Sequence, residues 1–154
     1  MATETSFQRA LQLPRSLPRA VLLLDGVFLA LVGSVAMIQE ALGHFAARGP
    51  LAYLFQSPYT IGGFEAHGLA VILGALLVKQ SADANAKLWH GVGLAIHLLL
   101  GASNMAFWPS FVTLGLLPIG IATTVIHAGF VVAHFFCFRR YGHATHRLAS
   151  SALP

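Results

Sequence analysis

Polar residues recur every seven positions in two apolar segments of the chain. The two series are His90, His97 and Asn104, and then Gly120, His127 and His134. Seven residues return an α-helix to nearly the same face, about 20° off, and advance it by about 10.5 Å. Neutral imidazole is a common ligand for iron, copper and zinc. The spacing therefore predicts two helices that carry facing histidines and could hold a cofactor or a metal.

The first hypothesis is a haem- or metal-binding redox component. Two facing histidines on neighbouring helices can hold haem b, with small residues beside them for the porphyrin edge. We expect His97 and His127 to be this pair, with Gly93 and Gly101 about one turn to either side of His97. A transition metal is the alternative cofactor, with His90, His134, Glu40 and His44 as its candidate ligands.

The second hypothesis is an acid–base enzyme embedded in the membrane. Carboxyl and imidazole groups exchange protons with a substrate when they are held within hydrogen-bond reach. Glu65, His67 and Asp25 are the candidate catalytic residues. The substrate would be an apolar lipid-, terpene- or quinone-like molecule that is isomerised or cyclised. No GxSxG motif supports a hydrolase.

The third hypothesis is a non-catalytic structural or assembly subunit of a larger membrane complex. The polar residues would then connect helices by hydrogen bonds, which contribute about 0.6 kcal/mol each on average in a membrane. Whether the protein is an enzyme stays open between these three hypotheses.

Composition places all of these groups in a membrane protein. The chain has 154 residues, of which 56% are hydrophobic and 9% charged, and its mean hydropathy is +0.73. Soluble domains carry roughly 25% charged residues, and so short a chain could not bury this much apolar surface in water. The net charge of +4 comes from residues at the ends of apolar runs, which does not predict nucleic-acid binding.

Four apolar segments predict an all-α, up-down bundle of four transmembrane helices. They run from about 20 to 45, 61 to 78, 86 to 107 and 112 to 138, between tails at 1–19 and 139–154. About 20 residues of helix cross a bilayer, and the backbone of a single segment can satisfy itself in lipid only as a helix. A longer connection over 46–60 joins the first two segments, and a very short one near Pro109 joins the last two.

Basic residues predict that both termini are cytoplasmic, because short cytoplasmic segments are enriched in Lys and Arg. The cytoplasmic side would hold Arg9, Arg15, Arg19, Lys79, Lys87, Arg139, Arg140 and Arg147. The opposite side would hold only Arg48. We expect a multi-pass protein of the cell membrane, or of an organelle membrane in a eukaryote.

The second segment opens with Gly62, Gly63, Phe64 and Glu65 after the longer connection. Together with the four-segment layout, this resembles the DoxX-like class of small membrane proteins. The resemblance implies a four-span membrane protein and assigns a role to no residue.

Overall fold

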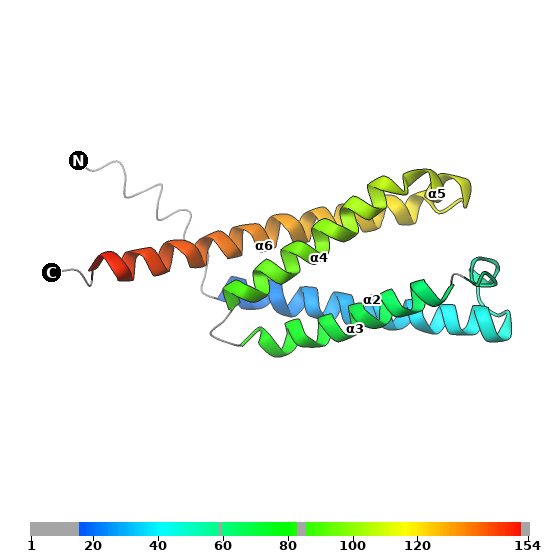
Figure 1. Cartoon of the computed structure of the whole chain (residues 1–154), viewed down its shortest axis with the longest axis horizontal. Coiled ribbons are helices and arrows are strands. Elements are labelled where there is room, and N and C mark those ends of the chain that lie inside the picture. Colours follow the sequence, from blue (N-terminus) through cyan, green and yellow to red (C-terminus); the bar gives the residue numbers. More distant parts are fainter. Residues whose placement is uncertain (1–15, 59, 83–85, 152–154) are drawn as a thin grey trace. The chain divides into compact units, whose positions relative to one another are not determined.

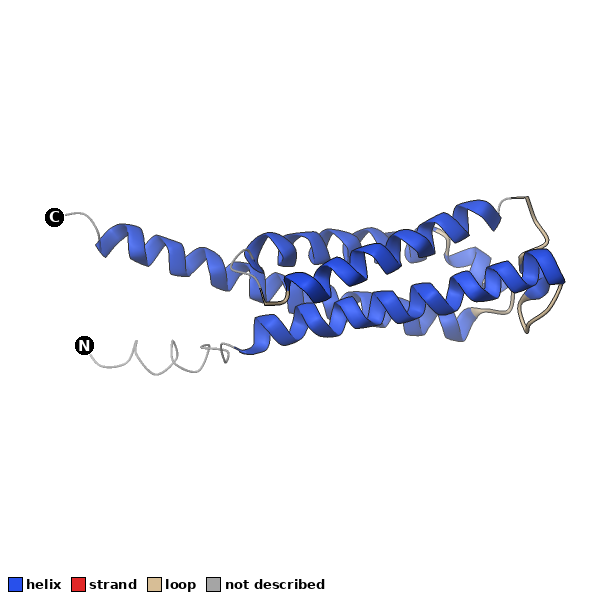
Figure 2. Ribbon diagram, turned by 90° about the horizontal axis from the view of Figure 1, so that it is seen from below, coloured by secondary structure: helices blue, strands red, loops and turns tan. Residues whose placement is uncertain are grey.

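The computed structural model describes residues 16–58, 60–82 and 86–151, and their side chains as far as residue 140. These residues are almost entirely helical and include no strand (Figure 2). The elements are α2 (Ser16–Ala46), η1 (Ala52–Leu54), α3 (Thr60–Gln80), α4 (Ala86–Ala106), α5 (Trp108–Thr113) and α6 (Leu117–Ser151). The all-α prediction is confirmed over this part of the chain. Most of the predicted N-terminal tail lies outside the described residues.

The described helices form two compact units, divided near residue 22 and again near residue 84 (Figure 1). One unit contains α3 and most of α2, and the other contains α4, α5 and α6. Each unit is a helical hairpin with its own connection. A single four-helix bundle with cytoplasmic termini stays a prediction.

Glycines bring α2 and α3 into backbone contact. A Cβ atom added to Gly26 would lie 2.6 Å from the carbonyl oxygen of Gly74, and a Cβ atom on Gly74 would lie 2.6 Å from that of Gly26. About two turns beyond Gly26 on α2, a Cβ atom on Gly33 would lie 2.7 Å from the carbonyl oxygen of His67. Small residues at such crossings let helices associate through close packing in lipid.

The connection between α2 and α3 folds back onto the end of α2. The chain leaves α2 through two residues with positive φ, Ala47 at 51° and Gly49 at 104°. The Gln56 side chain then donates a hydrogen bond of 2.6 Å to the carbonyl oxygen of Gly43. Phe55 fills the space beside Gly43, where an added Cβ atom would lie 2.7 Å from its ring. This connection is therefore an ordered cap on the hairpin.

The α4–α6 hairpin turns through a short helix. Pro109 lies in the first turn of α5, a position that needs no backbone N–H donor. Gly115, at a φ of 70°, follows α5, and Pro118 lies in the first turn of α6. The last long helix consequently begins at Leu117 rather than near residue 112, and the connection is longer than predicted.

The helix α6 also continues beyond the predicted end of the fourth segment. Arg139 and Arg140 end the apolar run, but arginine is a good helix former and does not stop the backbone. The helix extends to Ser151. The start of the predicted C-terminal tail is therefore part of α6.

Within the described residues, three helices are long and apolar enough to cross a membrane: α2, α3 and residues Leu117–Arg140 of α6. Many large apolar side chains on these helices are exposed, among them Leu24, Ile61 and Val125 at 65–66%. Such surfaces suit contact with lipid. The helix α4 is not among the three. That α4 crosses the membrane stays a prediction.

Candidate metal centre in the α4–α6 hairpin

Two pairs of histidines meet inside the α4–α6 hairpin. His90 on α4 and His134 on α6 share a hydrogen bond of 2.9 Å between their Nδ1 atoms. His97 and His127 share an equivalent bond, also 2.9 Å. The helices run in opposite directions, so a step of seven residues up α4 matches a step of seven down α6. The structure thus brings the predicted pairs together, and their role as ligands stays a prediction.

The four histidines are buried. His90, His97 and His134 have no exposed surface, and His127 is 8% exposed. Within each pair one Nδ1 atom must carry a hydrogen and the other must accept it. Neither pair can therefore consist of two imidazolium ions in this arrangement. At least one ring of each pair is in the neutral form that binds metals.

The two pairs form one continuous cluster. The rings of His97 and His134 are stacked with centroids 6.1 Å apart and planes 17° apart. The ring of Phe130 is stacked on His97 at 4.6 Å and 15°. One ring nitrogen of His97 and one of His134 lie within 4.8 Å of each other, so these two residues could hold a metal ion together. We call His90, His97, His127 and His134 the histidine cluster.

Gly93 makes room for one member of the cluster. A Cβ atom at Gly93 would lie 2.6 Å from both Cε1 and Nε2 of His134. An imidazole ring therefore fills the space beside Gly93 that was expected to accommodate a porphyrin edge. Gly101 is less constrained, since its added Cβ atom would lie 3.6 Å from Cβ of His127, an ordinary contact distance.

The polar line continues beyond the cluster through residues that the sequence analysis did not select. The Asn104 amide donates to the hydroxyl groups of Thr123 at 3.0 Å and Thr124 at 3.3 Å. Thr124 also donates to the carbonyl oxygen of Gly120 at 2.7 Å. The signal was present in the sequence, because both threonines lie about one turn from Gly120 in the seven-residue series.

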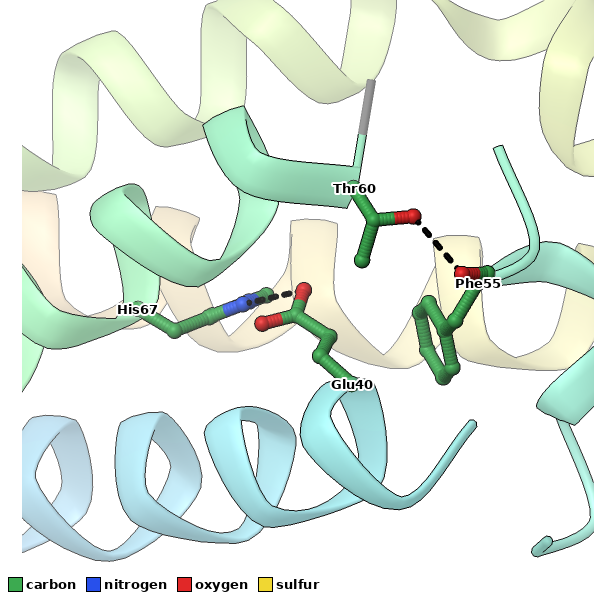
Figure 3. Close-up of polar contacts among 4 residues, drawn as sticks. All are labelled: Glu40, Phe55, Thr60 and His67. Atoms are coloured by element: carbon green, nitrogen blue, oxygen red, sulfur yellow. Dashed lines mark hydrogen bonds and ion pairs between the residues drawn. The ribbon is translucent and has the colours of Figure 1, made fainter. Parts of the chain in front are cut away.

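The three candidate acid–base residues lie in different surroundings, and their catalytic role stays a prediction. His67 makes an ion-pair contact of 2.9 Å between its Nδ1 atom and Oε1 of Glu40 (Figure 3), whereas Glu65 is exposed. Residues two positions apart lie about 200° apart around a helix, so Glu65 and His67 face different directions. Asp25 is buried in α2, but about 22 Å of helix separates it from Glu40 at roughly 1.5 Å per residue.

The predicted metal ligands Glu40 and His44 also have separate partners. Nδ1 of His44 lies 3.0 Å from the carbonyl oxygen of Phe55, while Glu40 contacts His67. Both side chains line the same cleft at the loop end of the α2–α3 hairpin. In this arrangement the imidazole of His44 serves to hold the connection.

Comparison with family models, curated proteins and solved structures finds no match to this chain. The function must therefore be argued from the geometry of the sites themselves.

Proposed function

We propose that this protein is a membrane protein that binds a transition-metal ion through the histidine cluster of its α4–α6 hairpin. The observation that carries the proposal is the approach of a nitrogen of His97 to one of His134 within 4.8 Å, between two further histidines. Imidazole ligands suit zinc, copper, iron and nickel. Copper or iron would give the protein a redox activity, as expected for a redox component.

The hydrogen bonds within the cluster support this assignment of ligands. A histidine that binds a metal usually holds its other ring nitrogen in a hydrogen bond, which fixes the tautomer and the ring orientation. Nδ1 of His97 is held by His127, and Nδ1 of His134 is held by His90. This pattern fits His97 and His134 as the metal ligands, with His127 and His90 as orienting partners.

The same contacts favour a metal ion over haem b. Bis-histidine haem places a porphyrin between its two imidazole ligands. The rings of His97 and His127 instead meet at 2.9 Å, and His134 occupies the space beside Gly93. A haem would require the two helices to separate, whereas a small ion needs only side-chain adjustment.

The test is metal binding by the purified protein. The protein in detergent is stripped with a chelator, reloaded separately with Cu²⁺, Zn²⁺ or Co²⁺ and desalted, and its metal content is measured. We expect one ion per chain with at least one of these metals, and loss of that ion in His97→Ala and His134→Ala. His90→Ala and His127→Ala should lower the affinity by about 10- to 100-fold, the usual effect of removing an orienting partner.

The matched control is His44→Ala, which removes an exposed histidine from the other hairpin and should leave the metal content unchanged. Helical circular dichroism checks that each variant is folded. Retention of the full metal content by folded His97→Ala and His134→Ala, or failure of the native protein to retain any of the three metals, would refute the proposal.

A further inference from the structure

The loop end of the α2–α3 hairpin contains a cleft of about 530 Å³. Small-molecule sites typically measure about 300–1,000 Å³ and have mostly apolar walls with a few polar groups. The walls of this cleft follow that pattern. Its apolar lining consists of Ala41, Phe45, Pro58, Ile61 and Phe64.

A buried carboxyl group is the polar feature of the cleft. Glu40 is 4% exposed, and its Oε1 atom is paired with Nδ1 of His67 at 2.9 Å. Its Oε2 atom is buried and has no hydrogen-bond partner within the described part of the chain. A buried acceptor without a donor has lost its hydrogen bonds to water without replacement, so a donor supplied to Glu40 would be bound favourably.

The surroundings hold Glu40 at this place. The glycine at position 63 leaves room for the carboxyl group, since an added Cβ atom would lie 2.6 Å from Oε1 of Glu40. Thr60, at the start of α3, donates to the carbonyl oxygen of Phe55 at 3.1 Å and so holds the connection beside the cleft (Figure 3). Carboxylate oxygens accept hydrogen bonds, so a hydrogen-bond donor on a ligand would complement Oε2 of Glu40.

We propose that this cleft binds an apolar molecule that carries a hydroxyl group, with the hydroxyl donating to Glu40 and the apolar body lying against Phe45, Ile61 and Phe64. A hydroxyl is the smallest neutral group that supplies the missing donor. Because α2 and α3 are apolar enough to span a membrane, such a ligand would reach the cleft from the lipid.

The experiment compares two probes of similar shape, 4-nonylphenol and its methyl ether 4-nonylanisole, in which a methyl group replaces the hydrogen-bond donor. Binding to the full chain in phosphatidylcholine nanodiscs is measured as the excess over empty nanodiscs. We expect saturable binding of the phenol that is at least about tenfold tighter than binding of the ether, the size expected for a hydrogen bond to a charged acceptor. Glu40→Gln should reduce this preference to less than about threefold.

Two further variants make the test specific. Glu65→Gln removes an exposed carboxyl group of α3 that does not line the cleft, and it should retain the full preference. Ile61→Trp fills the cleft at a side chain that is 66% exposed, so it should fold normally and lose binding of both probes. Equal binding of phenol and ether by the native protein, an unchanged preference in folded Glu40→Gln, or unchanged binding in Ile61→Trp would overturn the proposal.

Discussion

Replacing Gly93 by alanine would test the geometry of the histidine cluster with one carbon atom. The new Cβ atom would lie 2.6 Å from Cε1 and Nε2 of His134 and 2.9 Å from its Nδ1 atom. These distances are far inside van der Waals contact, so the imidazole ring must move. His134 is completely buried, and the interaction first affected is its hydrogen bond to His90.

The expected magnitude differs between stability and metal binding. Overpacking a buried site costs about 1–3 kcal/mol, but alanine also gains up to about 1 kcal/mol over glycine within a helix. The net loss of stability should therefore be about 0–3 kcal/mol. Displacing His134 moves a proposed ligand and its orienting partner together, so metal affinity should fall by at least 10- to 100-fold.

Gly101→Ala is the matched control on the same helix. Its Cβ atom would lie 3.6 Å from Cβ of His127, which is ordinary packing, so metal affinity should be unchanged and stability equal or slightly higher. Stability can be followed by circular dichroism during titration with a denaturing detergent, and affinity by competition with a chelator of known strength. The reasoning fails if Gly93→Ala and Gly101→Ala bind metal equally well.

Two further substitutions test the helix contacts. Gly74→Ala places a Cβ atom 2.6 Å from the backbone of Gly26, so it should destabilise the α2–α3 hairpin by about 1–3 kcal/mol in the detergent titration. Gly62→Ala has open space around it and should not destabilise the hairpin. Equal stabilities of the two variants would contradict the backbone contact. Asn104→Ala removes the hydrogen bond to Thr123 and should cost about 0.6–1.7 kcal/mol in the same titration, and a variant as stable as the native protein would mean that this bond contributes nothing.

The helices could be predicted from the sequence because apolar runs of about 20 residues leave few alternatives in lipid. Their ends were less predictable. Pro109 and Gly115 indicate a break between the long helices, but only the folded backbone shows that a separate short helix, α5, forms there. Arg139 marks the end of an apolar run, but arginine is also a good helix former. The helix can therefore continue beyond the residue at which the apolar run ends.

The histidine pairs were predictable for a similar reason, since equal seven-residue spacing on two antiparallel helices matches at successive levels. The partner of Glu40 could not be predicted from the sequence. It is His67 on another helix, and the spacing of residues within either helix does not assign this pair. The close pairing depends on Gly63, where the absent side chain leaves space for the carboxyl group. A prediction that weighs only ionisable residues misses such a space.

The histidine cluster also explains how the α4–α6 hairpin keeps a single register. In the observed alignment all four histidines are paired, as His90 with His134 and His97 with His127. Sliding α6 by seven residues would pair only His97 with His134 in one direction, or only His90 with His127 in the other, and the remaining two histidines would face new neighbours. A slide by one turn would pair none of them, and each buried polar group left without a partner would be costly in a membrane. The residues proposed to bind the metal would therefore also fix the alignment of the helices that hold them.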